Sequence, residues 1–80
     1  MIKIIFFAAL RERLGTHEMN FEISFPSPCG KVLAHLGRSF PQLAPFLSSC
    51  MIAVNGSYAE PSDTLSEGDE LALLPPVSGG

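Results

Sequence analysis

The chain of 80 residues is long enough for one domain with a single hydrophobic core. Its 46% hydrophobic residues, 16% charged residues and mean hydropathy of +0.29 favour a folded chain over a disordered one. Such an apolar chain is also expected to present a partner-facing patch. The net charge of -3 and the total of only five Lys and Arg argue against binding to nucleic acid, and favour a basic partner.

Few residues of this chain could form a membrane span, a metal site or a disulfide. The longest apolar run, residues 4–10, is too short to cross a bilayer, so we expect a cytoplasmic protein with no membrane partner. Cys29 and Cys50 have no paired spacing and are expected to be reduced, buried small hydrophobes. His17 and His35 are expected to be solvated, and with the cysteines they lack the spacing of a zinc site. We therefore expect no metal and no cofactor bound by this chain.

The first third of the chain predicts strand, helix and strand. Residues 2–7 are β-branched and aromatic and predict a central strand. Its even positions would share one face, leaving Ile5 and Phe7 on the other. Residues 8–14 are good helix formers, and Gly15 is a plausible C-terminal cap. Residues 17–25 alternate and predict a half-exposed strand, with these apolar positions on one face: Met19, Phe21, Ile23 and Phe25.

The middle of the chain predicts the one long helix. We expect Ser27 to be its N-cap and Pro28 its first residue. Pro41 should end it, and residues 42–47 should form a turn or a short helical piece. Apolar residues recur at helical spacing along this segment: Cys29, Val32, Leu33, Leu36 and Phe40.

The last third predicts a hairpin and a final strand. Residues 50–54 read as a short buried strand, Asn55-Gly56 as a two-residue hairpin turn, and residues 57–59 as the returning strand. Residues 66–69 should form a turn that leads into the last strand, residues 70–74.

This order of elements predicts a two-layer α+β domain with a mixed sheet of four to five strands packed on one main helix. The last strand can return beside the first, which is the arrangement of the β-grasp, or ubiquitin-like, fold. We expect residues 1–74 to form the domain and residues 75–80 to form an extended tail.

The tail is the predicted centre of chemistry. Pro75 and Pro76 remove two amide donors, so the last strand cannot go on pairing, and six extended residues reach roughly 20 Å. Val77 and Ser78 follow, and then Gly79 and Gly80, whose missing side chains would suit a narrow channel and an unhindered carbonyl. A frayed terminus is the alternative.

A terminal carboxylate with a pKa of roughly 3.5 is an anion at neutral pH and a poor electrophile. It needs activation, for example as an acyl-adenylate that a sulfur or nitrogen nucleophile then attacks. The chain has no glycine-rich phosphate loop, so we expect another protein to hold the ATP.

Four segments of the sequence resemble one family. The segments MIKIIFFAALRERLG, AVNG, SEGDELALLPP and VSGG together resemble the small, sulfur-carrier subunits of molybdopterin synthases, in the MoaD/ThiS branch of ubiquitin-like proteins. The ending PPVSGG is the most specific part of this resemblance. Leu73 and Leu74 depart from the aromatics that commonly precede the two prolines in that family, and the start of the long helix is less regular than usual.

The resemblance implies that an E1-like, ATP-dependent activating enzyme adenylates Gly80, which is then converted to a thiocarboxylate. It implies docking on the large synthase subunit in a heterotetramer, and sulfur donation to cyclic pyranopterin monophosphate. The positions that match the family's apolar docking surface are Phe7, Tyr58 and Leu74. For Phe7 and Leu74, ordinary core positions are the alternative.

Three other functions remain open at this point. The same sulfur chemistry could serve thiazole synthesis, although the PPV lead-in favours the molybdenum pathway. A ubiquitin-like modifier that forms isopeptide bonds to lysines is compatible with the same tail. A β-grasp interaction module would need no covalent chemistry at all.

Overall fold

The computed structural model describes residues 1–24 and 26–76. The helices and strands, in chain order, are β1 (Ile2–Phe6), α1 (Ala8–Leu14), β2 (Glu18–Phe21), β3 (Ser27–Pro28), α2 (Cys29–Ser39), the 3-10 helix η1 (Pro41–Leu43), α3 (Ala44–Leu47), β4 (Met51–Val54), β5 (Ser57–Ala59), β6 (Thr64–Leu65) and β7 (Glu70–Leu74).

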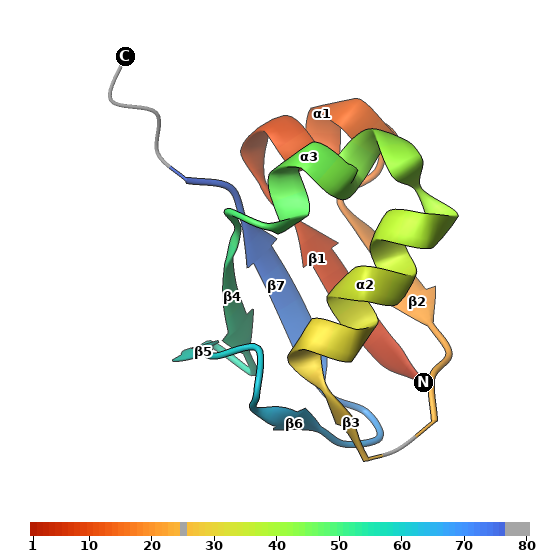
Figure 1. Cartoon of the computed structure of the whole chain (residues 1–80), viewed down its shortest axis with the longest axis vertical. Coiled ribbons are helices and arrows are strands. Elements are labelled where there is room, and N and C mark those ends of the chain that lie inside the picture. Colours follow the sequence, from red (N-terminus) through yellow and green to blue (C-terminus); the bar gives the residue numbers. More distant parts are fainter. Residues whose placement is uncertain (25, 77–80) are drawn as a thin grey trace.

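Five strands form the main sheet, in the order β2-β1-β7-β4-β5 (Figure 1). β1 and β7 are parallel neighbours at its centre, whereas the β1–β2, β7–β4 and β4–β5 pairs are antiparallel. The last strand therefore returns beside the first, and the predicted α+β grasp fold is confirmed. This placement brings the end of β7 next to the end of β1, because the two strands run in the same direction.

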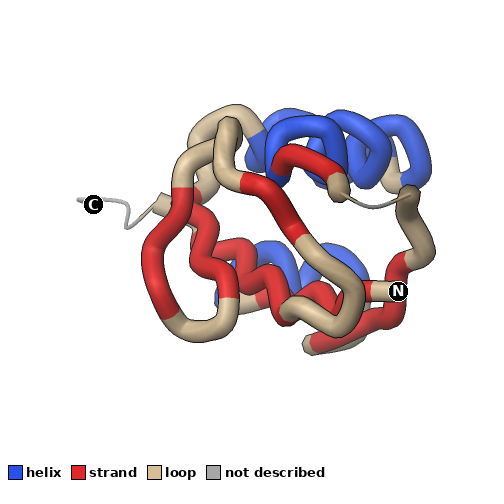
Figure 2. The backbone as a smooth tube through the Cα atoms, turned by 90° about the horizontal axis from the view of Figure 1, so that it is seen from below, coloured by secondary structure: helices blue, strands red, loops and turns tan. Residues whose placement is uncertain are grey.

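Helices α2 and α3 cover one face of this sheet, whereas α1 lies at its end, at the level of the strands (Figures 1 and 2). α2 buries Cys29, Val32 and Leu36 against that face, so its predicted apolar stripe is confirmed. From β1 and β7 the buried positions alternate along each strand, which is the period of a sheet with one covered face. They are Ile2, Ile4, Phe6, Leu71 and Leu73, all at most 1% exposed.

The segment between β1 and α2 was only partly predicted. α1 has the expected bounds, and Gly15 caps it at φ 75° with its N–H on the Arg11 carbonyl, 2.9 Å away. β2, however, ends at Phe21 instead of reaching residue 25. The predicted alternation continues past the strand, because Ile23 still packs against the core. Phe25 lies outside the described residues.

The predicted start of the long helix was wrong. Ser27 lies in β3, 4% exposed, and pairs with Leu65 of β6, while Pro28 is the N-cap and α2 begins at Cys29. The amides of Cys29 and Gly30 donate to the carbonyls of Asp63 and Pro61, at 2.8 Å each. Backbone carbonyls of a distant loop thus satisfy the donors that a serine side chain was expected to cap.

A hydrogen-bonded clasp joins the β4–β5 hairpin to the start of β7. The Asn55 side chain donates to Asp69 Oδ1 at 3.0 Å, and its Oδ1 accepts the Glu70 N–H at 3.0 Å. Asp69 Oδ2 accepts the Ser66 N–H at 2.8 Å. These bonds to backbone and side-chain donors lower the pKa of Asp69. The clasp fixes where β7 begins, and so fixes the course of the strand that leads into the tail.

Candidate functional site: an apolar hollow at the end of the last strand

The uncovered face of the sheet carries an exposed apolar hollow of about 310 Å³. Its lining comes from β4, β5 and β7, from the hairpin turn and from the residue after β1: Phe7, Ala53, Gly56, Tyr58, Glu70, Ala72 and Leu74. We call this the outer hollow. The structure thus brings together the three residues of the predicted docking surface, Phe7, Tyr58 and Leu74, from widely separated parts of the chain. Their binding role remains a prediction.

Phe7 belongs to this surface and not to the core, since it is 45% exposed. β1 ends one residue earlier than predicted, although the Phe7 N–H still donates to the Leu73 carbonyl at 3.3 Å. Ala8 then turns the chain abruptly with φ 51°, a left-handed conformation that is unfavourable for a residue with a Cβ. The turn starts α1 directly after Phe7, so the ring stays at the end of the strand on the uncovered face.

Tyr58 is presented by a tight hairpin. Asn55 and Gly56 have φ 51° and 86°, as a type I′ turn requires at both central positions, which confirms the Asn-Gly prediction. Tyr58 pairs with Ala53 and is 73% exposed. Alanines on the neighbouring strands leave the hollow open beside its ring, because a methyl side chain fills little space.

Leu74 is the last residue of β7 and is half-buried, whereas Leu73 before it is fully buried. Pro75 and Pro76 follow directly and make no further strand, as expected from their missing donors. The predicted boundary of the last strand at Leu74 is therefore confirmed. The predicted tail residues Val77, Ser78, Gly79 and Gly80 lie outside the described residues.

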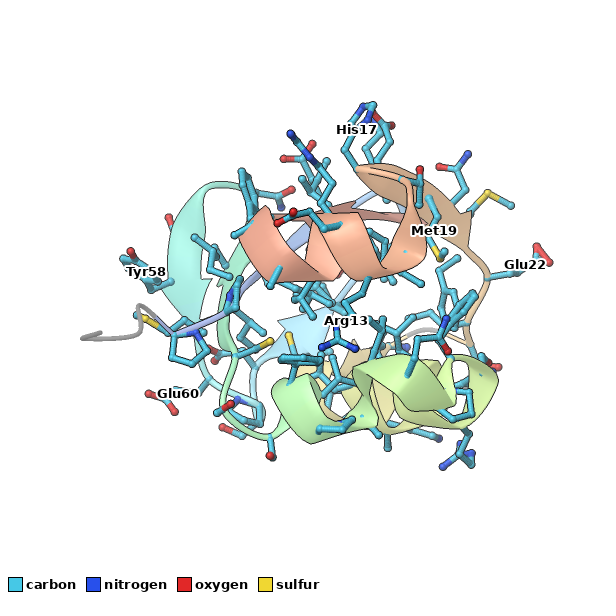
Figure 3. The ribbon with its side chains drawn as sticks, turned by 90° about the horizontal axis from the view of Figure 1, so that it is seen from above. Arg13, His17, Met19, Glu22, Tyr58 and Glu60 are labelled. Carbon is cyan, nitrogen blue, oxygen red and sulfur yellow. The ribbon has the colours of Figure 1, made fainter. Side chains whose placement is uncertain are left out.

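The opposite side of the same sheet face, along the edge strand β2, is charged. Lys3 Nζ lies 3.5 Å from Glu18 Oε2, and His17 Nε2 lies 3.2 Å from Glu18 Oε1. Figure 3 shows His17 well away from Tyr58. The uncovered face is thus divided, with charged side chains on the β2 side of the sheet and apolar ones on the side of β7, β4 and β5. A partner that binds the apolar side also binds next to Pro75, where the predicted tail begins.

One exposed residue of this region was missed from the sequence. Met51 is 52% exposed and pairs with Leu74, so it extends the apolar surface across β4. The sequence CMIAV, residues 50–54, predicts a buried strand. The strand alternates instead, with Ile52 4% exposed between two more accessible neighbours, and this period of two was the available signal.

Among the described residues, the candidate cysteines and histidines do not form a second site. Both cysteines are free, and burial raises the pKa of each thiol, with nearby Asp63 adding to the effect at Cys29. Both histidines are exposed, although the ring of His35 also meets Phe21 edge-on at 5.1 Å. Within residues 1–24 and 26–76, no three His, Cys, Asp or Glu side chains gather as a metal site would require. In the same ranges no helix is long and apolar enough to cross a membrane.

The chain belongs to the ThiS family, whose profile matches residues 4–80. It is 37% identical to the molybdopterin synthase sulfur carrier subunit of Chlamydomonas reinhardtii, over 99% of this chain and 98% of that protein. It is 34% identical to the subunit of the same name from Escherichia coli, over the whole of both chains.

Two solved structures extend the comparison. SAMP1 from Haloferax volcanii superimposes with a TM-score of 0.84 at 29% identity, over 99% of this chain and 98% of that one. A chain from the complex of subunits 1 and 2 of the molybdopterin-converting factor from Helicobacter pylori has a TM-score of 0.69 at 25% identity, over 99% and 97%.

Proposed function

We propose that this chain is the sulfur-carrier subunit of a molybdopterin synthase, and that Gly80 carries the sulfur. The observation that most strongly supports this proposal is that β7 ends at Leu74, which lines the apolar outer hollow. The sequence then runs through two prolines to Gly79 and Gly80. The relatives named as sulfur carrier subunits support this assignment, since the similarity spans their length and the ending of this chain.

Loading requires two chemical steps at Gly80. The carboxylate attacks ATP, which forms a C-terminal acyl-adenylate and releases pyrophosphate. A persulfide sulfur then displaces AMP, and a thiol reduces the resulting acyl disulfide to the thiocarboxylate. The missing side chain at Gly80 leaves the attacked carbonyl open on both faces. We assign ATP to an E1-like adenylyltransferase, because this chain offers no phosphate loop.

Transfer uses the thiocarboxylate as a nucleophile. Its sulfur attacks a carbon of cyclic pyranopterin monophosphate and displaces an oxygen leaving group there, which gives a thioester between the acceptor and Gly80. Water then breaks the bond between the sulfur and the Gly80 carbonyl carbon, which leaves the sulfur on the acceptor and restores the carboxylate of Gly80. Positioning the tail in a closed site raises the effective concentration of the sulfur. We place that closed site and its catalytic residues on the large subunit, in a cytoplasmic heterotetramer with two carriers.

The outer hollow would be the docking surface for these partners. It combines an aromatic ring that is 45% exposed with one that is 73% exposed, beside an aliphatic residue at the tail exit. Aromatic residues are common among the anchors that supply most of the binding energy of an interface. The Helicobacter pylori complex of subunits 1 and 2 supports a large-subunit partner for this chain.

The decisive experiment is the intact mass of the protein purified from cells that make the cofactor. We expect a fraction whose mass is raised by the difference between sulfur and oxygen, located at Gly80 by fragmentation. A variant without Gly80 should still bind the large subunit but should transfer no sulfur to the pterin in a reconstituted assay. A chain that never carries the extra mass under these conditions would contradict the proposal.

A second function is favoured by the likeness to small archaeal modifier proteins. The small archaeal modifier protein 1 of Methanosarcina acetivorans superimposes with a TM-score of 0.82 at 30% identity. A modifier would be found joined to larger proteins through an isopeptide bond, so the same purification should be searched for conjugates.

Sulfur carriage for thiazole synthesis would give the same mass change as sulfur carriage for the molybdenum cofactor. Deletion of the gene separates the molybdenum pathway from the thiazole pathway, because it should remove either the molybdenum cofactor or thiamine.

A further inference from the structure

The free edge of β5 has a hydrogen-bonding direction that the pairing of β4 determines. The Asn55 N–H donates to the Glu70 carbonyl of β7 at 2.9 Å. The backbone N–H and carbonyl of Ala53, two residues earlier in β4, therefore also point towards β7. Its partner in β5 is Tyr58. Tyr58 is thus in a non-hydrogen-bonded pair, and its own amide N–H and carbonyl point away from β4, towards the edge of the sheet.

Hollows flank this edge on both sides. On the uncovered face of the sheet lies the outer hollow, which Tyr58 lines. On the helix side lies a second hollow of about 300 Å³, which Tyr58 also lines together with Ala59, Leu33 and Leu47. A strand added to an edge points its side chains alternately to the two faces of the sheet. The edge of β5 can therefore receive both the backbone and the alternating side chains of an extended segment.

The other edge of the sheet is protected. β2 has Glu18 paired with Lys3 and His17, and charged side chains at an edge are a known defence against unwanted strand pairing. Beside β5, Tyr58 and Glu60 project on the side of the molecule opposite Glu22 (Figure 3). Glu60 is the only charged side chain in the segment from β5 to Pro61. The two edges therefore differ in their suitability for pairing.

We propose that the edge of β5 accepts an extended segment of the large synthase subunit as an additional strand of the sheet. The inference rests on the proposed function, which supplies a partner for the tail. Strand addition gives affinity through main-chain hydrogen bonds and specificity through pockets for alternate side chains. An added strand would also fix the orientation of the carrier about the axis of β7. Contact at the outer hollow alone would fix this orientation less firmly.

The edge defines the chemistry of the added segment. One apolar side chain should enter the outer hollow opposite Tyr58, and its neighbours should enter the hollow on the helix side. A basic residue should lie near Glu60, whose carboxylate is exposed. The Glu60 N–H already donates to Asp63 Oδ2 at 2.7 Å, and Pro61 has no donor, so pairing should stop there. The segment is therefore short.

The first test is amide hydrogen exchange of the full-length carrier, alone and bound to the large subunit encoded in the same genome. In the free carrier we expect the Tyr58 amide to exchange fast and the Asn55 amide to exchange slowly. Binding should slow exchange at Tyr58 by at least about tenfold, because its N–H gains a partner. Docking through side chains at the outer hollow alone would leave the Tyr58 amide exchanging at the free rate, and would overturn the inference.

The second test replaces the amide hydrogen of Tyr58 by a methyl group. Cys50 allows a native ligation of residues 1–49 to a synthetic peptide of residues 50–80, so N-methyl-Tyr58 can be introduced without altering any side chain. The methylated chain should fold as stably as the unmethylated chain made by the same ligation. Its Kd for the large subunit should rise roughly two- to tenfold, as expected for one lost hydrogen bond. An unchanged Kd would contradict strand addition.

The outcomes separate the two proposals. If the large subunit does not bind the unmodified carrier, the proposed function fails. If it binds without protecting Tyr58, only the strand addition fails. If Tyr58 becomes protected in the carrier alone as its concentration rises, with a dimer in sedimentation, the edge pairs with a second copy and the inference is wrong.

Discussion

The two faces of the central strands differ sharply although neighbouring residues are chemically alike. Phe6 is 1% exposed and Phe7 is 45% exposed, and Leu73 is fully buried beside the half-buried Leu74. One position along a strand therefore separates a residue that holds the domain together from one that is available to a partner. The parallel pairing of β1 with β7 places Phe7 and Leu74 at the same end of the sheet. Function here depends on register more than on residue type.

The largest contrast is expected between Phe6→Ala and Phe7→Ala. Removing the buried ring should lower the free energy of unfolding by about 3–5 kcal/mol, because it leaves a cavity in the core. Removing the exposed ring should cost less than about 1 kcal/mol. Urea denaturation measures both values. If Phe6→Ala does not fold, Phe6→Leu provides the comparison, and equal costs at the two positions would show that the two faces are energetically alike.

Binding to the large subunit should depend on the outward-facing residues instead of the buried ones. Phe7→Arg and Leu74→Arg should each weaken binding to the large subunit by about 2 kcal/mol or more, since each puts a charge into an apolar contact. Their melting temperatures should stay within about 4 °C of the parent. Asn20→Arg, on the charged half of the same face, is the matched control and should leave Kd nearly unchanged. Calorimetry measures the affinities. A variant that unfolds would place its residue in the core instead.

The sheet and the main helix could be predicted from the sequence because each had a local signal. The docking residues Phe7, Tyr58 and Leu74 came instead from the family resemblance, and their binding role remains a prediction. Strand alternation identified Phe7 as outward-facing, Asn55-Gly56 identified the hairpin, and the two prolines identified the end of β7. The start of α2 could not be predicted in this way. Its amides are satisfied by carbonyls of the loop around Pro61, more than thirty residues later in the chain, and a two-residue strand such as β3 has no period to detect.

The left-handed turn at Ala8 was equally invisible, because alanine normally indicates helix. Ala8→Gly should raise the free energy of unfolding by about 0.5–1 kcal/mol, since glycine adopts φ 51° without a steric penalty. Gly15→Ala makes the opposite change at φ 75°, where a Cβ would meet nothing within 4 Å, so it should cost a similar amount through backbone strain alone. Thermal unfolding compares the pair. Opposite signs are expected, and equal signs would refute the strain at Ala8.

The smallest effect should come from the clasp that fixes the start of β7. The pKa of Asp69 is lowered by the Ser66 N–H and then by the Asn55 amide, so the folded state prefers the carboxylate. A lowered folded pKa contributes stability above the unfolded pKa of roughly 3.9, and this stability is lost as the pH falls through the folded value.

Asp69→Asn should therefore be less stable than the parent at pH 7, and the difference should shrink as the pH falls below about 4. Urea denaturation at a series of pH values measures it. Glu22→Gln is the control for loss of a charge, because Glu22 is exposed and takes part in none of the ion pairs among the described residues. If the two variants respond alike to pH, the effect is one of net charge. If only Asp69→Asn changes, its hydrogen bonds hold the strand that leads into the tail.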